Sequence, residues 1–253
     1  MNTANSIEIT SLIVASGLVL LTLFLSYWQR LKLERDILIG MIRAVCQLIV
    51  VGYLLSYIFD VDSYIFTTLL LLFMILNAAY NSAHRGKEIR NGFFISVIAI
   101  TTGSGITLAV LILSGIISYH PAQIVPVSGM IIGNSMVALG LCYRAMLRDF
   151  ELKREEVETK LALGADILPS SIEIIRASIR TGMIPTIDSA KTLGVVSLPG
   201  MMTGLILAGT SPMEAIKYQI MVTFMLLSTT AISSLIACYL AYRYFFNSNK
   251  QLL

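Results

Sequence analysis

Charged residues are scarce in this sequence. Only 13% of its 253 residues are Asp, Glu, Lys or Arg, whereas 56% are hydrophobic and the mean hydropathy is +0.80. Soluble domains carry about 25% charged residues. The composition therefore excludes an ordinary soluble fold and predicts that lipid is part of the solvent. The few basic residues are not clustered beside aromatic ones, which argues against a nucleic-acid-binding face.

Cysteine and histidine are also rare. Cys46, Cys142 and Cys238 all fall in apolar stretches, and their odd number and spacing indicate no disulfide framework. We interpret them as small packing residues, with a thiol near a transport path as the alternative. His84 and His120 are too few to build a histidine metal site, so the sequence leaves any metal ligands unknown.

A nucleotide-binding motif is missing too. The sequence contains no Gly-x-x-x-x-Gly-Lys-Ser/Thr loop, which cradles phosphates, and no acidic strand of the Walker B kind. If ATP supplies energy, another polypeptide binds it. The apolar stretches also contain no His, Asp or Glu, which argues against an intramembrane enzyme with a buried nucleophile and base. We therefore expect a chain that is not an enzyme and holds no cofactor of its own.

Long apolar runs dominate the sequence instead. A helix needs about 20 apolar residues to cross the hydrocarbon core of a bilayer. Arg43 is the one charged residue inside the candidate runs. The prediction is an all-α, polytopic membrane protein, one transmembrane domain over residues 1–253, with seven spans: Ile9–Trp28, Ile37–Phe59, Ser63–Ala83, Phe93–Ser118, Pro121–Tyr143, Leu193–Gly209 and Tyr218–Tyr242.

The distribution of Lys and Arg predicts the orientation. If the spans alternate, almost all basic residues, including Lys191, fall on one side, and Lys217 alone falls on the other. Basic loops stay in the cytoplasm. The N-terminus is therefore predicted outside and the C-terminus in the cytoplasm, with the chain in the plasma membrane, which is the inner membrane of a bacterium.

The segment 147–191, between spans five and six, is the longest cytoplasmic stretch. Its pattern predicts two amphipathic helices, which can lie on the membrane surface or dock a soluble partner. Gly164 is expected to cap the first helix. Ser170 and Glu173 have capping-box spacing at the start of the second, and Gly182 and Pro185 are expected to end it. The first helix has an apolar stripe formed by Leu147, Phe150, Val157 and Leu161.

The run from Glu158 to Ala165, Glu-Thr-Lys-Leu-Ala-Leu-Gly-Ala, resembles the EAA loop of ABC-transporter permeases. In that family the loop enters a groove on the ATP-binding subunit. Thr159 and Lys160 stand where the family has alanines, and the downstream Ile-x-Leu-Pro is lacking at its usual offset. The alternative is an ordinary capped surface helix. The residues expected to meet an ATPase are Glu158, Leu161, Leu163, Gly164, Ala165 and Asp166.

Nearly the whole chain resembles the FetB family of permeases. The longest matching strings are Arg43–Tyr53, Gly129–Ala138, Ile184–Gly204 and Ala215–Met225. The resemblance implies a bacterial iron exporter with a separate ATPase, and plant relatives tied to aluminium tolerance. Because one chain has one coupling loop, the expected assembly is a homodimer with two ATPase subunits, which hold the Mg-ATP.

Polar and helix-breaking residues within the spans are the candidates for a transport pathway, because they are costly in lipid. Pro199 and Gly200 are expected to break span six, either to line a cavity or as a packing kink. Methionine thioethers suit soft metals better than iron, so packing is the favoured interpretation of the methionines. For the asparagines, hydrogen bonding between helices is the favoured interpretation. The candidates are Arg43, Gln47, Asn77, Asn81, Asn134, Pro199, Gly200, Met201 and Met202.

The leading hypothesis is therefore the permease of an ABC exporter for iron or another metal. Two alternatives stay open: an ABC permease for a non-metal substrate, and a seven-helix membrane sensor. The sensor leaves the long capped loop without a role.

Overall fold

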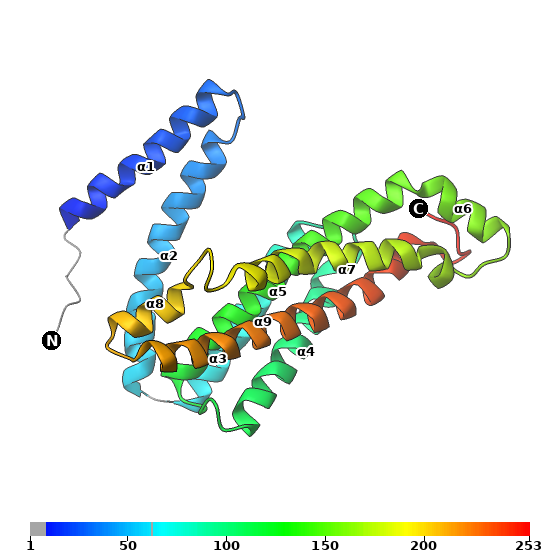
Figure 1. The fold of residues 1–253 in the computed structure, drawn as a ribbon. Helices are drawn as coiled ribbons and strands as arrows, with labels where there is room; N and C mark the ends of the chain where they lie inside the picture. Colours follow the sequence, from blue (N-terminus) through cyan, green and yellow to red (C-terminus); the bar gives the residue numbers. More distant parts are fainter. Residues whose placement is uncertain (1–8, 62) are drawn as a thin grey trace. The chain divides into compact units, whose positions relative to one another are not determined.

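The computed structural model describes residues 9–61 and 63–253 (Figure 1). In that part the chain forms nine α-helices and one short 3-10 helix, and no strand longer than an isolated bridge, which confirms the all-α prediction. The contacts divide the chain into two units, Met1–Asp62 and Ser63–Leu253, and each is described by itself. The predicted outside position of the N-terminus concerns residues 1–8, which lie outside the described part.

The first unit contains α1 (Ile9–Trp28) and α2 (Glu34–Val61). A short turn joins them, and Arg30 in this turn has a left-handed φ of 52°. The hydroxyl of Ser26, near the end of α1, donates to Glu34 Oε1 at 2.9 Å. This bond holds the end of α1 to the start of α2 and makes the pair a helical hairpin.

Five helices are long and apolar enough to cross a membrane by length and composition. They are α2 and, in the second unit, α3 (Tyr64–His84), α4 (Gly92–Leu113), α5 (Pro121–Leu152) and α9 (Pro212–Ala241). Helix α1 covers the first predicted span, although its described apolar stretch, Val14–Trp28, is shorter. A polytopic helical membrane protein is therefore confirmed, whereas the number of seven spanning helices stays a prediction.

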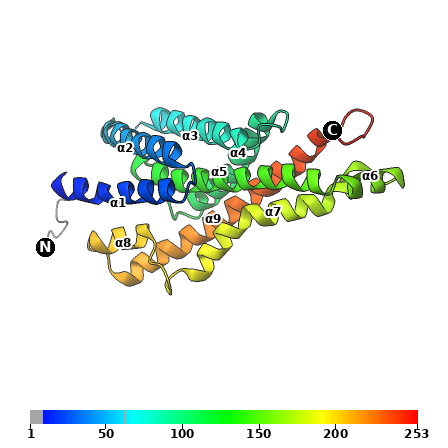
Figure 2. The ribbon, with the colours of Figure 1, turned by 90° about the horizontal axis from the view of Figure 1, so that it is seen from above.

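Helix α5 is the centre of the second unit and contacts α3, α4, α7 (Ile167–Thr192) and α9. Helices α5, α7 and α9 lie side by side (Figure 2). At Gly182 of α7 a Cβ atom would clash with Cys142 Sγ and would lie 2.9 Å from the carbonyl oxygen of Ala138, both on α5. The missing side chain at Gly182 therefore lets α7 approach α5 closely. Helix association in lipid depends on such close contacts.

Hydroxyl groups connect the helices of this unit. Thr229 of α9 donates to Thr107 Oγ1 of α4 at 2.6 Å, and Ser233 of α9 donates to the carbonyl oxygen of Ala99 at 3.1 Å. These bonds satisfy polar groups that have no water partner inside a bilayer. They also fix the register of α9 against α4.

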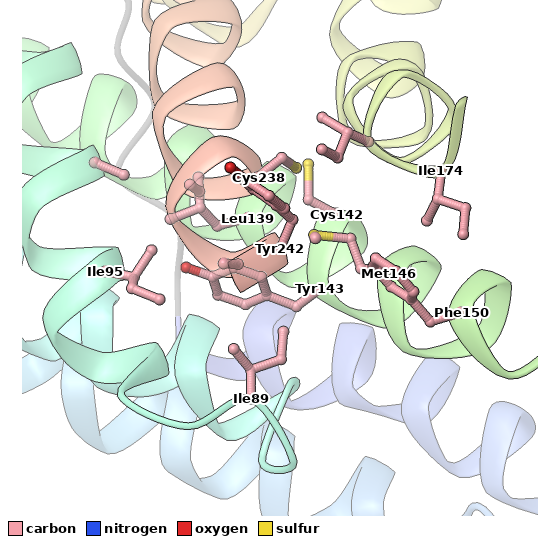
Figure 3. Close-up of a cluster of buried hydrophobic side chains, with 14 of the residues drawn as sticks. Ile89, Ile95, Leu139, Cys142, Tyr143, Met146, Phe150, Ile174, Cys238 and Tyr242 are labelled. Atoms are coloured by element: carbon pink, nitrogen blue, oxygen red, sulfur yellow. The ribbon is translucent and has the colours of Figure 1, made fainter. Parts of the chain in front are cut away.

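A buried apolar cluster lies where α5 leaves the helix bundle and meets α6 (Arg154–Ala162) (Figure 3). Tyr143 is fully buried there, and its hydroxyl lies 2.9 Å from Ser96 Oγ. Phe150 stacks on Phe245 with ring centroids 4.1 Å apart. The cluster and the side chains packed against it include the four residues of the predicted apolar stripe: Leu147, Phe150, Val157 and Leu161. Their placement on one helix is wrong, because α5 continues to Leu152 and α6 begins only at Arg154.

The sixth predicted span, Leu193–Gly209, is wrong as a single helix. Only α8 (Gly200–Leu207) is helical in that range, and eight residues rise about 12 Å, far less than the hydrocarbon core. Pro199 is the N-cap of α8, so the expected break at Pro199 and Gly200 is a helix start. Residues 193–199 form a turn in which Gly194 has φ +77°.

The predicted end of the second amphipathic helix is also wrong. Helix α7 passes through Gly182 and Pro185 and ends at Thr192, because the glycine serves the contact with α5 and the helix tolerates the proline. Its N-cap is Asp166, which accepts from the Ile167 N–H at 2.9 Å. Ser170 lies inside the helix, so the predicted capping box at Ser170 and Glu173 is wrong as well.

Candidate functional site

The turn between α6 and α7 has the geometry that its sequence predicts. Gly164 adopts φ +91°, which favours glycine because it has no Cβ. Its N–H donates to the carbonyl of Leu161 at 2.9 Å, and the N–H of Ala165 donates to that of Lys160 at 3.0 Å. This pair of bonds is a Schellman motif. The predicted glycine cap is confirmed, and the chain reverses sharply from α6 into α7.

The residues of this turn differ in what they present to a partner. Leu163 is 84% exposed, whereas Leu161 packs against the buried cluster. We expected both leucines to face outward, but only Leu163 does so. Glu158 is exposed and pairs with Arg154 at 2.8 Å. Asp166 is exposed at the start of α7.

Ion pairs hold α6 and α7 in place. Lys160 Nζ lies 2.6 Å from Glu156 Oε1 on α6 and 3.8 Å from Glu173 Oε1 on α7. The hydrogen bond with Lys160 lowers the pKa of Glu156, and the same bond raises the pKa of Lys160. Both groups are therefore charged at neutral pH, and Lys160 bridges the two helices.

The C-terminal tail touches the same region, which sequence reasoning missed. Arg154 donates to the backbone carbonyls of Leu253 at 3.1 Å and Leu252 at 3.3 Å. Lys250 pairs with Asp166 at 2.9 Å, and hydrogen bonding to Lys250 lowers the pKa of that carboxyl. No motif in the sequence predicts these contacts, because they join residues that lie about 90 positions apart in the chain.

A cavity of about 310 Å³ lies between α5, α7, α8 and α9. It brings together four of the predicted pathway residues, Asn134, Pro199, Gly200 and Met201. All of its lining side chains are uncharged. The lining residues are Met130, Asn134, Val137, Ala138, Gly182, Pro185, Thr186, Ser189, Ala190, Leu193, Pro199, Gly200, Met201, Gln219, Val222, Thr223 and Leu226.

Gln219 is the polar residue in this cavity that sequence reasoning overlooked. Its Oε1 atom is buried and has no hydrogen-bond partner among the described residues. A buried acceptor without a partner is rare and calls for an explanation such as a bound molecule. Asn134 donates through Nδ2 to the Met130 carbonyl at 2.9 Å. The cavity therefore offers amide and hydroxyl groups to a polar occupant.

Comparison with known proteins places the chain in a family. Residues 9–246 match the model of the uncharacterised protein family UPF0014. The chain belongs to this family.

Three relatives of this UPF0014 member match over nearly the full chain. The "Probable iron export permease protein FetB" of Escherichia coli (strain K12) is 54% identical over 98% of this chain and 97% of its own length. The rice "UPF0014 membrane protein STAR2" is 38% identical over 95% of this chain and 84% of its own. The Arabidopsis "Protein ALUMINUM SENSITIVE 3" is 35% identical, with coverages of 92% and 86%. No solved structure matches the chain significantly.

The other predicted pathway residues of this UPF0014 protein lie elsewhere. Asn81 donates through Nδ2 to the Asn77 carbonyl and to Asn77 Oδ1, both at 2.8 Å, along α3 and not between helices. Met202 follows Met201 on α8 without lining the cavity. Arg43 and Gln47 are exposed one turn apart on α2, in the first unit.

Metal-ligating side chains are dispersed in the described part of the chain. No three of its His, Cys, Asp and Glu residues lie close enough to hold a metal ion. Cys142 and Cys238 are buried free thiols that neighbour each other in the apolar cluster (Figure 3).

Proposed function

We propose that this protein is the membrane-spanning permease of an ABC exporter that moves iron or another metal out of the cytoplasm, powered by a separate ATPase. The observation that carries the proposal is the capped turn at Gly164, a rigid corner with Leu163 exposed at its tip. An exposed apolar side chain on a fixed corner suits insertion into a groove of a partner. Iron is proposed as the metal because the Escherichia coli relative is named an iron export permease.

Helix α7 is the element that transmits movement in this proposal. It begins at Ile167, directly after the turn, and continues unbroken to Thr192, a length of about 39 Å. Thr186 and Ser189, near its far end, line the cavity. A push on the turn by an ATPase therefore displaces the cavity wall through a single rigid helix.

The cavity is the proposed cargo site. Asn134, Met201 and the unpartnered Gln219 acceptor line it, and α8 and the turn before it form one wall. Interrupted helices of this kind commonly border substrate sites in transporters. Arg43 and Gln47 of α2 are also proposed as transport residues, because polar side chains within a span are costly in lipid.

The assembly and orientation belong to the same proposal. Two copies of this chain bind two ATPase subunits, which hold the Mg-ATP, in the plasma membrane (the inner membrane of a bacterium), with the N-terminus outside. The chain crosses seven times. The sixth crossing is made by the second half of α7 together with the turn and α8, because α8 alone is too short.

The test is copurification of an ATPase with the tagged chain, together with iron efflux from cells. Leu163→Asp is expected to lose the ATPase and abolish efflux, because a charge enters the apolar groove. Leu152→Asp is the matched control, since Leu152 is 75% exposed and lies outside the turn. Equal ATPase recovery from both variants would place the coupling surface elsewhere.

A second experiment identifies the cargo. It measures how a panel of metals and chelates stimulates ATP hydrolysis by the reconstituted complex. Stimulation by iron supports the proposed metal export. Stimulation only by solutes without metal would favour the non-metal permease.

A further inference from the structure

One face of helix α7 carries charged residues in two groups, which are separated by two uncharged turns. The side chains on that face recur at helical spacing and are all exposed: Glu173, Arg176, Arg180, Asp188 and Lys191. The opposite face packs against α5 and α9 through buried Ile174, Ile175 and Gly182. The charged face therefore points away from the bundle from one end of the helix to the other.

Contacts with neighbouring helices fix how deep this face reaches. Thr186 Oγ1 lies 3.5 Å from Thr230 Oγ1, in the middle of the predicted span Tyr218–Tyr242. Ser189, less than one turn further along α7, lines the cavity together with residues of α5 and α9. Thr186 thus lies level with the centre of the predicted span Tyr218–Tyr242, and Lys191 lies only about 7.5 Å further along α7, not at a cytoplasmic end as the charge distribution suggested.

Two charged side chains are exposed at this depth. Lys191 Nζ lies 3.0 Å from Asp188 Oδ1, and the two side chains are 68% and 60% exposed. Charged side chains at the centre of a bilayer face a bundle interior or a water-filled cavity, because exposure to lipid is costly even for a pair. The charged face of α7 is therefore not a lipid-facing surface.

We propose that the charged face of α7 lines a water-filled pathway whose opposite wall is a second copy of this chain, a proposal that rests on the proposed dimeric permease. A twofold axis places the same surface of each copy against the other. Both copies have the same orientation in the membrane, so each charged residue of one α7 lies level with the same residue of the other, and water between them is needed to screen the like charges. The pathway suits a cargo that stays hydrated, a metal ion or a small metal chelate.

A matched pair of isoleucines tests the pathway. Ile184 lies on the charged face and is 45% exposed, and Ile106 of α4 is 48% exposed. Ile106 is at similar depth, because its neighbour Thr107 accepts from Thr229 and the next residue, Thr230, contacts α7. Each is replaced by cysteine in a Cys46→Ser background, since Cys142 and Cys238 are buried.

The probe is a membrane-impermeant thiol reagent that carries a quaternary ammonium group. Ile184→Cys is expected to react at least about tenfold faster than Ile106→Cys, because the thiolate that reacts forms in water and not in lipid. A short bifunctional thiol reagent is expected to join two copies through Ile184→Cys only. Equal reaction rates, or Ile184→Cys chains that never become linked, would overturn the proposal.

A separate readout distinguishes this inference from the proposed function. Copurification of the ATPase is measured with both cysteine variants. If the ATPase is retained and Ile184→Cys stays unreactive, the pathway along α7 is refuted and the permease stands. If the wild-type chain retains no ATPase, the proposed function fails, whatever the labelling of Ile184→Cys reports.

Discussion

Lys250 Nζ lies 2.9 Å from Asp166 Oδ1, so the C-terminal tail is tied to the N-cap of α7. Arg154 of α6 holds the same tail through two backbone carbonyls. The tail thereby contacts both helices that flank the turn at Gly164. These contacts add to the Lys160 bridge in fixing the angle between α6 and α7.

The first prediction concerns the pH dependence of this tail contact. Hydrogen bonding to Lys250 and to the Ile167 N–H lowers the pKa of Asp166 below its ordinary value of 3.8. A lowered carboxyl pKa contributes stability above the ordinary pKa and loses it as the pH falls through the lowered value. The contact between Lys250 and Asp166 is therefore expected to persist from pH 7 to about 4 and to weaken below that, whereas the bonds from Arg154 to the tail remain.

Fluorescence anisotropy of a dye on Leu253→Cys, in the Cys46→Ser background, measures the attachment of the tail. Lys250→Gln is expected to lower the anisotropy already at pH 7. Lys217→Gln, which breaks the exposed pair with Glu214 at the start of α9, is the control. A tail that is equally immobile in Lys250→Gln and wild type would contradict the prediction.

The second prediction concerns the cap at Gly164. Gly164→Val forces a β-branched residue into a left-handed conformation at a cost of about 1–2 kcal/mol, and is expected to reduce ATPase copurification and uncouple hydrolysis from transport. Gly115→Val is the matched control, because Gly115 also has a positive φ of 71° and open space around it, but it follows α4. The same loss of ATPase in both variants would indicate general misfolding and not a coupling defect.

The third prediction concerns Gln219. A buried unpaired acceptor destabilises a fold by about 1–3 kcal/mol, so Gln219→Leu is expected to keep or raise the melting temperature while lowering metal export. Gln123→Leu serves as control, since Gln123 accepts from the Ser118 N–H and lies outside the cavity. Export at the wild-type rate by Gln219→Leu would remove this residue from the cargo site.

The fourth prediction concerns Arg43. An arginine within a span is expensive in lipid and marks a functional position. Arg43→Leu is expected to abolish export while the protein still inserts, whereas Arg35→Gln at the start of α2 is expected to export normally. Efflux and membrane content are measured together. Undiminished efflux from inserted Arg43→Leu would mean that the arginine only reaches the headgroups.

The fifth prediction concerns the orientation of α3. In a Cys46→Ser background, Ser63→Cys and Lys87→Cys flank this helix and are expected to label from opposite sides of the membrane. Lys87 is preferable to Asn91, because Asn91 has a left-handed φ of 61° that strains cysteine. Labelling of both positions from the same side would refute the seven-span topology.

The sequence by itself determined the features that depend on neighbouring residues. Long apolar runs with few charges predict α2, α3, α4, α5 and α9, because in lipid a helix satisfies every backbone group within its own segment. The glycine at position 164 predicts the turn between α6 and α7, because only glycine adopts φ +91° without strain. The burial of Phe150 and Val157 follows equally from the spacing of apolar residues, although the break between α5 and α6 at Lys153 does not.

Tertiary structure alone decided the region from Gly182 to Gly209. Glycine and proline usually end helices, but Gly182 is where α7 crosses α5 and the helix continues. The apolar run after Leu193 suggested a span, but it forms a turn and the short α8 against α9. The physical reason is that α5 and α9 already provide a surface for the second half of α7. Packing between helices outweighs local preference there, and it brings Thr186 beside Thr230 in α9, a contact that the neighbouring sequence does not reveal.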